Sequence, residues 1–586
     1  MPGWEGDWYI CRTFDIMCPM SEDRKRKKRR KKLRRKLLRV IPFAVALLLI
    51  VIVIAVSMKL GLLEKYSYSY DKVDLNEYFG LTSSDQIPLM LDNKYSVGAL
   101  YKENDKYYLQ MDMVSELFDD NYYYNEAENM MLYTTGTENN VLTEGSDYII
   151  RNNSDVFLSI DAVSEYAGMK IVNYSEPERV EIIYNRTEEE ISEATVTKNT
   201  QCRVLGGIKS EVLTDIIKGS KVCVLSAMDE WSEVKTEDGF IGYVENKVLD
   251  DYNTKTLSPI EAKKAFSVPH NLYNEKICLG WHQVMSRDAN QTIETVVAQS
   301  KGMNVISPTW FTVGDNEGNI SSIASVEYVN YAHERGIKVW ALVDNFLSDV
   351  NMYQILSNTA SRVNLEKQLI NAAAEATVDG INIDFENLDV ECGPHFAQFI
   401  RELSLECHQN NLVLSVDNYV PKEYTSFYHR EVQGRFADYV IIMGYDEHYS
   451  GSKEAGSVAS FDYVREGIEK TLEDVDASQV INGIPFYTRI WHEGASLDSE
   501  AVGMNEAEAY LSNRGVTPVW DDITAQNYAQ FSDSDGRNCE VWLEDEFSIA
   551  AKLNLVETNN LAGVAFWKLG LEKASIWDTV ATYLNK

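Results

Sequence analysis

Residues 270–586 alternate between short apolar runs and amphipathic segments. Eight of the runs have the length and composition of buried strands. They cover residues 276–281, 303–307, 338–343, 380–386, 412–416, 439–445, 480–487 and 562–567. Amphipathic segments, among them 293–301, 325–334, 365–376, 395–409 and 464–472, separate these runs. Eight strand–helix units predict an α/β chain with a (β/α)8 barrel. Residues 488–545, rich in Trp, Tyr and Asp, predict an α+β lobe inserted before the last unit.

The fourth run contains an unusual set of acids. In Asp379-Gly-Ile-Asn-Ile-Asp-Phe-Glu386, the polar residues Asn382, Asp384 and Glu386 alternate with apolar ones. Period two places these three side chains on one face of a strand. Buried like charges repel, so one carboxyl must take up a proton or find a partner. Such an arrangement favours a site where a carboxylic acid donates a proton at neutral pH.

Other candidate site residues lie at the ends of neighbouring strands. Met443, Tyr445 and Asp446 end the sixth run, and Trp567 ends the eighth. The active sites of such barrels lie at the carboxyl ends of the strands, so these side chains converge with Asp384 and Glu386. A tryptophan offers an apolar face for a sugar ring, and the polar groups fix its substituents. Alone, the acid pair could also be a structural polar network in the barrel core.

These motifs resemble glycoside hydrolase family 18. The family has D-G-x-D-x-D-x-E on strand four, M-x-Y-D on strand six and a Trp on strand eight, and all three sites occur here in order. The closest likeness is to the YaaH/SleL-type branch of bacterial cell-wall and spore-cortex lytic enzymes, through residues 384–387 and 307–310. From that likeness we also expect Trp310, which follows the second strand, to bind substrate.

The resemblance implies substrate-assisted retention, an exception to the two-carboxylate scheme. Glu386 would protonate the glycosidic oxygen and later act as base towards water. The substrate's own N-acetyl carbonyl would attack the anomeric carbon. Asp384 would bind the acetamide N–H and Tyr445 its carbonyl, while Asp446 and Trp567 would contact the sugar. No cofactor and no metal is implied.

One residue departs from the family pattern. The family usually has Asp where this chain has Asn382, and a carboxylate there can share a proton with Asp384. An asparagine can hydrogen-bond to Asp384 without adding charge. We expect the difference to affect the pH profile. The same Asn is usual in the YaaH/SleL-type branch, so it does not indicate inactivity.

Basic and acidic residues are distributed unevenly along the chain. Residues 1–39 hold 14 Lys/Arg against 5 Asp/Glu, and the remainder holds 41 against 85. A remainder this acidic excludes nucleic acid as a partner. Residues 40–58 follow the basic tail without a charge, which predicts a transmembrane helix with the N-terminus in the cytoplasm and the catalytic domain outside. A cleaved signal peptide is the alternative, and translation could begin at Met20.

Two small modules are predicted between the membrane and the barrel. After a linker at 59–84, residues 85–190 contain a weak repeat, in which 108–118 matches 157–167; each copy predicts a strand, an Asp-capped short helix and an extended segment. This module resembles the N-terminal domain of copper amine oxidases, but the chain has no His before 270 to ligate copper. Residues 194–252 resemble bacterial SH3-like domains, which often bind cell-wall peptides; a spacer without ligand is the alternative.

Cys202 and Cys223 could pair or remain buried thiols.

Three functions therefore stand open. The first is a membrane-anchored hydrolase of an N-acetylglucosamine-containing glycan, with peptidoglycan ahead of chitin. The second is a family-18 lectin that binds glycan without cleaving it; retention of Glu386 argues against it. The third is a wall-binding scaffold. The catalytic domain in the first reading spans residues 270–586.

Overall fold

The computed structural model describes residues 21–60, 65–81, 83, 86–118, 121–142, 148–152, 155–184 and 186–584. The chain forms two compact units. The first comprises residues 1–99 and 170–260, and the second comprises 100–169 and 261–586. The segment predicted as one stalk, 85–190, therefore contributes to both units.

The first unit contains the N-terminal helix α1, Ser21–Lys59. Its part Val40–Lys59 is long and apolar enough to cross a membrane by length and composition, and none of it is buried inside the protein. The other elements are α3 (Leu75–Tyr78), β1 (Gln86–Leu91), β10 (Glu178–Tyr184), β11 (Glu189–Val196), β12 (Thr200–Arg203), β13 (Val212–Ile216), β14 (Lys221–Ala227), β15 (Trp231–Thr236), β16 (Ile241–Glu245), η1 (Asn246–Val248) and β17 (Leu249–Leu257). Strands β2 (Lys94–Glu103) and β9 (Met169–Ser175) run across the sequence boundaries of the units.

Strands β11–β17 form one seven-stranded sheet in the order β13-β12-β16-β15-β14-β11-β17. Buried and more exposed residues alternate along these strands, as expected for a sheet with one face in a core. Val234 on β15 and Val244 on β16, for example, are fully buried. Of the two alternatives for Cys202 and Cys223, the structure shows free thiols, with Cys202 buried and Cys223 partly buried. Burial raises the pKa of Cys202 to about 12.

The second unit begins with the short elements β3 (Lys106–Gln110), α4 (Met111–Leu117), β4 (Tyr122–Asn125), β5 (Met130–Thr134), β6 (Asn139–Val141), β7 (Ile149–Asn152), β8 (Asp155–Ser159) and α5 (Ile160–Tyr166). The two repeated segments do form a strand followed by a short helix. The expected Asp caps are wrong, however: Gln110 and Ser159 occupy the N-cap positions, and Asp112 and Asp161 lie in the first turns. There an acid still favours the helix through its dipole.

The barrel of the second unit is confirmed. Its eight parallel strands are β18 (Ile277–His282), β19 (Val305–Val313), β21 (Lys338–Asp344), β22 (Gly380–Asp384), β23 (Val413–Tyr419), β24 (Tyr439–Met443), β25 (Val480–Pro485) and β31 (Gly563–Trp567). Pairing of β18 with both β31 and β19 closes the sheet. The short antiparallel strand β20 (Ile320–Ser322) extends β19.

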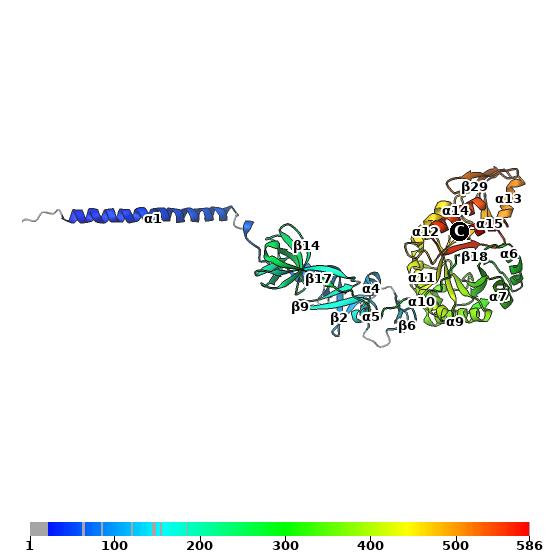
Figure 1. The fold of residues 1–586 in the computed structure, drawn as a ribbon, viewed down its shortest axis with the longest axis horizontal. Helices are drawn as coiled ribbons and strands as arrows, with labels where there is room; N and C mark the ends of the chain where they lie inside the picture. Colours follow the sequence, from blue (N-terminus) through cyan, green and yellow to red (C-terminus); the bar gives the residue numbers. More distant parts are fainter. Residues whose placement is uncertain are drawn as a thin grey trace, which may run out of the picture. The chain divides into compact units, whose positions relative to one another are not determined.

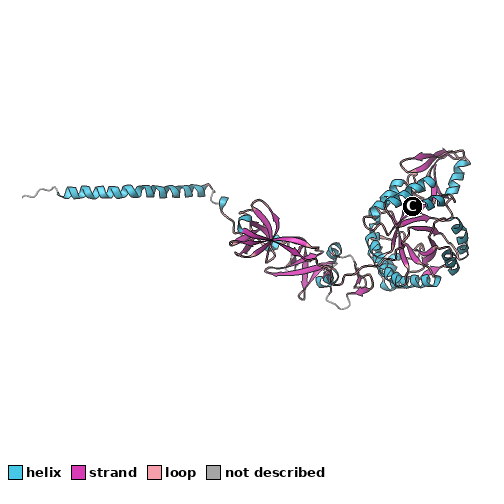
Figure 2. Cartoon of the chain, viewed as in Figure 1, coloured by secondary structure: helices cyan, strands magenta, loops and turns pink. Residues whose placement is uncertain are grey.

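Helices surround the barrel strands (Figures 1 and 2). They are η2 (Asp288–Thr292), α6 (Ile293–Gln299), α7 (Val326–His333), α8 (Met352–Ser357), α9 (Thr359–Ala376), η3 (Val390–Cys392), α10 (Gly393–Gln409), η4 (Glu423–Tyr428), α11 (Arg430–Phe436), α12 (Phe461–Thr471), α14 (Glu546–Thr558) and α15 (Ile576–Leu584). Local signals set their ends. Asn358, for example, caps α9 by accepting the Ser361 N–H, and Thr377 ends it in the left-handed conformation.

The inserted lobe lies between β25 and β31 in the sequence. It comprises β26 (Tyr487–Glu493), β27 (Leu497–Gly503), α13 (Met504–Ser512), β28 (Val519–Asp521), β29 (Gln526–Ser532) and β30 (Asn538–Leu543). Its five strands form a sheet in the order β27-β26-β30-β29-β28. Trp491 is buried in this lobe, whereas Trp520 is 40% exposed.

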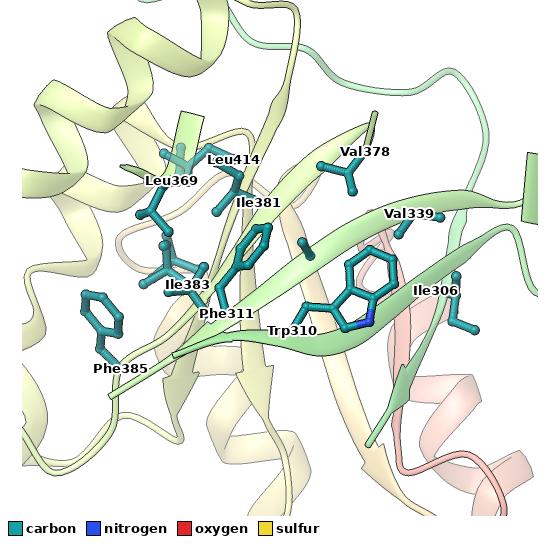
Figure 3. Close-up of a cluster of buried hydrophobic side chains, with 14 of the residues drawn as sticks. Ile306, Trp310, Phe311, Val339, Leu369, Val378, Ile381, Ile383, Phe385 and Leu414 are labelled. Atoms are coloured by element: carbon teal, nitrogen blue, oxygen red, sulfur yellow. The ribbon is translucent and has the colours of Figure 1, made fainter. Parts of the chain in front are cut away.

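The apolar face of β22 anchors the site strand in the core. Figure 3 shows Ile381, Ile383 and Phe385 among buried hydrophobic side chains. Phe385 stacks on Phe399 of α10 at a ring-centroid distance of 5.7 Å. Burying each such side chain stabilises the fold by about 1.5–3 kcal/mol. Because the apolar residues face the helices, the polar residues of the same strand face the barrel interior.

The start of β22 requires a glycine. A Cβ on Gly380 would lie 2.8 Å from the Val413 carbonyl oxygen, too close for any other residue. The preceding Asp379 accepts the backbone N–H of Val339 at 2.9 Å and pairs with Lys338. Asp379 therefore fixes the register of β22 against β21 and has no place in the site.

Residues 121–142 pack directly on the barrel helices. Asn125 donates to the Ser357 carbonyl at 2.7 Å, and Asn139 donates to Glu402 of α10 at 2.7 Å. The buried Arg362 of α9 donates to the same carboxylate at 2.6 Å. The β4–β6 sheet is therefore a structural part of the unit that contains the barrel.

Candidate active site

A cavity of about 230 Å³ opens at the carboxyl ends of the barrel strands. Its lining is acidic and aromatic: Trp281, Asp384, Glu386, Asp417, Tyr419, Met443, Tyr445, Asp446 and Trp567. Six of the eight predicted site residues therefore meet in one cavity. Trp310 and Asn382 do not line it.

Glu386 lies two residues beyond β22 and is half-buried. The Tyr419 hydroxyl donates to its Oε2 at 2.7 Å. Burial raises the pKa of Glu386, the Tyr419 hydrogen bond opposes that rise, and the charge of Asp446 adds to it. The side chain is therefore disposed to stay protonated at a higher pH than an ordinary glutamic acid, as a general acid requires.

The backbone of Glu386 is held by a single side chain. Asn345, just after β21, accepts the Glu386 N–H at 2.9 Å and donates to the Glu386 carbonyl at 2.8 Å. This two-point contact holds the residue where the strand hydrogen bonds have ended.

Asp384 lies deeper, 6% exposed, and its Oδ1 has no hydrogen-bond partner among the described residues. Burial raises the pKa of Asp384 well above its ordinary value, and the charges of Asp417, Glu386 and Asp344 add to the rise. A buried, unpartnered carboxyl oxygen in a cavity wall is suited to bind a polar group of a ligand.

Tyr445 and Asp446 enter from the turn after β24. Tyr445 is buried, and burial raises its pKa well above the ordinary value, so its hydroxyl stays protonated and can donate. Asp446 is exposed and adopts a left-handed conformation at φ 59°. Tyr487, at the start of the lobe, donates to Asp446 Oδ1, so the lobe helps to orient this carboxylate.

Two tryptophans form the apolar wall. Trp567 is half-buried, and its ring meets that of Trp281 edge to face at 5.9 Å. Trp281 in turn contacts Tyr445 at 6.4 Å. This wall can pack against the apolar face of a sugar ring.

Trp310 is the wrong choice among the predicted binding residues. It is 2% exposed, its indole N–H donates to Asn290 at 2.7 Å, and it packs against Tyr328. Figure 3 shows it in the hydrophobic core beside Val339 and Phe311. The strand β19 continues to Val313, beyond the predicted end at 307, and its alternation turns Trp310 away from the barrel interior.

Asn382 also differs from expectation. It is fully buried and does not contact the cavity. Its amide donates to Asp417 at 2.9 Å, and no hydrogen bond to Asp384 is present among the described residues. Its effect on a ligand can therefore act only through neighbouring side chains.

Three lining residues were not predicted. Asp417 and Tyr419 lie on β23, whose predicted run ended at 416, and Trp281 is the next-to-last residue of β18. The alternation Ser415, Asp417, Tyr419 was a usable signal, since period two aims all three at one face.

A polar groove of about 460 Å³ adjoins the cavity. Residues 345–353, 386–389 and Cys392 line it, including the exposed side chains of Phe346 and Leu347. Glu386 lines both the cavity and the groove. A ligand that filled both would pass its connecting bond beside this carboxyl group.

A separate polar cluster lies in the lobe. His492 Nδ1 lies 3.1 Å from Cys539 Sγ and 3.5 Å from Asp533 Oδ2. The Arg537 guanidinium donates to the same Asp533 oxygen at 2.8 Å. That cation opposes a metal ion at this carboxylate, and we assign no metal to the cluster.

Comparison with known proteins agrees with the geometry. Residues 312–572 match the family model described as Glycosyl hydrolases family 18. The match falls within the barrel that carries the site, so this barrel is similar to the family-18 glycosidases. The sequence resemblance is thereby confirmed.

Its relatives include a glycosylase and a cortical fragment-lytic enzyme. The glycosylase YvbX of Bacillus subtilis (strain 168) is 27% identical over 292 residues, which cover 47% of this chain and 84% of YvbX. The cortical fragment-lytic enzyme of the same organism is 26% identical over 241 residues, 39% of this chain and 56% of that enzyme. The spore cortex-lytic enzyme SleL of Bacillus megaterium QM B1551 is a structural neighbour with 20% identity and a TM-score of 0.47, covering 56% of this chain and 77% of SleL.

Proposed function

We propose that this protein hydrolyses an N-acetylglucosamine-containing glycan by substrate-assisted retention. The observation that carries the proposal is the pairing, in one cavity, of Glu386 with the unpartnered Oδ1 of Asp384. Peptidoglycan is the proposed substrate, because cortical fragment-lytic enzymes are among the relatives. Chitin is the alternative.

In the proposed reaction, the N-acetylated sugar packs on Trp567 and places its acetamide against Asp384 and Tyr445. Asp384 accepts the acetamide N–H, and the Tyr445 hydroxyl donates to the acetamide carbonyl. The carbonyl oxygen then attacks the anomeric carbon while Glu386 gives its proton to the glycosidic oxygen. The departing sugar lies in the adjoining groove. Water, deprotonated by Glu386, opens the oxazolinium intermediate and retains the anomeric configuration.

Asp384 supports this route electrostatically. The oxazolinium carries positive charge on the ring that includes the acetamide nitrogen. A carboxylate aimed at that nitrogen in a site shielded from water stabilises the charge as it develops. A positioned acid such as Glu386 contributes about 10²–10⁴-fold.

The test uses the full-length protein in detergent micelles. It is incubated with peptidoglycan and with chitin oligomers between about pH 4 and pH 8, and new reducing ends are counted. Mass spectrometry of the digests identifies the substrate and the bond cut. Absence of new ends at every pH overturns the proposal. Glycan binding without cleavage would instead support the lectin, and binding that needs only residues 59–252 would support the wall-binding scaffold.

We also propose that α1 anchors the enzyme in the cell membrane as a single span. The basic residues before Val40 favour a cytoplasmic N-terminus, which leaves the barrel outside the cell. An epitope tag at each end tests this orientation in intact cells treated with protease. Loss of the C-terminal tag with survival of the N-terminal tag is expected; the reverse pattern would contradict it.

A wall peptide is a further proposed partner, at the SH3-like sheet. A cavity of about 600 Å³ there is lined by both charges, including Lys221, Arg186, Glu189 and Glu193. A stem peptide also carries both charges, so the two are complementary. Binding of a labelled stem peptide that Lys221→Glu weakens would support the site, and binding unaffected by that substitution would exclude it.

A further inference from the structure

Three hydrogen bonds hold the Asn382 side chain in one orientation. The indole N–H of Trp281 donates to its Oδ1 at 2.9 Å, and the Ser307 hydroxyl donates to the same oxygen at 3.0 Å. An indole N–H can only donate, so the atom facing Trp281 must be the amide oxygen. The amide nitrogen therefore faces Asp417, to which it donates at 2.9 Å.

Asp417 lies on β23, the strand that pairs with β22. It is 3% exposed and lines the same cavity as Asp384. The pairing register places Asn382 opposite Ser415, so Asp417 is one inward position nearer the cavity than Asn382's direct partner. Asn382 thus touches the carboxyl group of Asp417 but adds no charge of its own.

The groups around this pair are mostly acids. The charges of Asp417, Glu386 and Asp344 act on Asp384, and the charge of Glu386 acts on Asp417. Tyr445, in the turn after β24, is close enough for the charges of Asp384 and Asp417 to act on it. Burial raises the pKa of both Asp384 and Asp417 well above the ordinary value. Two carboxyl groups in one buried site cannot both ionise cheaply, so the ionisation of one opposes that of the other.

We propose that Asp417 is a positioning residue that takes up the proton when Asp384 turns, as a carboxylate, to the substrate acetamide. This inference rests on the proposed function and deepens it. In this proposal Asp417, on the next strand, supplies the carboxyl partner of Asp384, and Asn382 holds Asp417 through a neutral amide. No proton leaves the site in this step: it passes from the Asp384 carboxyl to Asp417, and Asp384 then accepts the acetamide N–H.

Removing the Asp417 charge tests the assignment. Asp417→Asn keeps the shape, and we expect kcat to fall on the order of 10- to 100-fold with KM nearly unchanged, because the acetamide is no longer held by a carboxylate in the correct state. The acidic limb of the kcat profile should also move. Ser415→Ala, on the same buried face of β23, is the matched control and should change neither.

Moving the carboxyl group from residue 417 to residue 382 distinguishes a proton-accepting role of Asp417 from a packing role. The double variant Asn382→Asp/Asp417→Asn returns one carboxyl group to the site at the position usual in the family. We expect it to recover activity at least several-fold over Asp417→Asn. An Asp417→Asn protein with the parent kcat and pH profile would overturn the proposal, and so would a loss that the exchange does not rescue in folded protein.

A second readout does not depend on activity. A buried acid with a raised pKa stabilises the fold least at high pH, so stability should fall as the pH rises from about 5 to 8. Measured as melting temperature against pH, this fall should be smaller in Asp417→Asn than in the parent. In Ser415→Ala it should equal that of the parent. An unchanged slope in Asp417→Asn would contradict the shared proton. If the parent cleaves no glycan, the proposed function fails while this readout still decides the inference about Asp417.

Discussion

The Tyr419 hydroxyl donates a 2.7 Å hydrogen bond to Oε2 of Glu386 from the neighbouring strand. The bond favours the ionised form of Glu386 and so opposes the rise in its pKa caused by burial. Tyr419 therefore limits how far into the alkaline range Glu386 keeps its proton.

Tyr419→Phe should extend activity to higher pH. Without the hydrogen bond the pKa of Glu386 rises further, so the acid stays protonated longer and the basic limb of kcat/KM moves up by roughly half a unit to one unit. The pH profile of oligosaccharide cleavage measures it. Tyr424→Phe, at an exposed tyrosine in η4, is the control. A basic limb displaced to lower pH would refute the role given to Tyr419.

Glu386→Gln should abolish catalysis while preserving the fold. The amide keeps the shape of the side chain but cannot donate a proton to the glycosidic oxygen, and a loss of about 10²–10⁴-fold in kcat is expected. Reducing-end assays measure it, with circular dichroism as the check on folding. Glu391→Gln, in the exposed turn η3, should retain parental activity. Cleavage by Glu386→Gln at the parental rate would remove Glu386 from the mechanism.

De-N-acetylated oligosaccharides should be bound but not cleaved. Substrate assistance needs the acetamide carbonyl as nucleophile, and a free amine cannot replace it. Product analysis of matched acetylated and deacetylated oligomers tests this. Equal cleavage of the two would favour an enzyme nucleophile.

Asn345→Ala should lower kcat more than it raises KM. The substitution releases the Glu386 backbone at both its N–H and its carbonyl, and a small displacement of the acid costs about tenfold or more. Steady-state kinetics separates the two parameters. Asn410→Ala, at the exposed end of α10, provides the comparison. A pure KM effect would place Asn345 in substrate binding instead.

Arg362→Met should destabilise the second unit by about 3–5 kcal/mol, because it leaves the buried Glu402 carboxylate unpaired. Chemical denaturation followed by tryptophan fluorescence measures the change. Arg465→Met removes only exposed ion pairs of α12, which solvent screens, and should cost far less. Similar losses in both variants would mean that burial adds nothing to the Arg362 pair.

The sequence was most informative where periodicity and burial agree. All eight barrel strands were predicted, because each is a short apolar run between amphipathic helices. The acid pair of β22 was also recognised, since its carboxyl groups interrupt an apolar face. Both signals are local, and tertiary contacts only reinforce them.

The ends of the strands were predicted less well than their existence. The predicted fifth run ended at 416, yet β23 continues to Tyr419. Asn418 is satisfied by Gln433 of α11 at 2.6 Å, a partner that no local pattern reveals. The proton partner of Asp384 was missed for this reason. The family likeness brought Trp310 into the predicted site as a residue after the second strand, whereas β19 continues through it to Val313.

The order of segments in the two units affects how the enzyme could be released from its N-terminal helix. The chain passes between the units at three points, near residues 99, 169 and 260. A single protease cut near residue 260 would leave residues 261–586 held to 100–169 through contacts such as Asn139 with Glu402. Residues 100–169 would remain covalently joined to the first unit. Shedding of the catalytic barrel therefore requires those contacts to break as well as the peptide bond, and one cut is not enough.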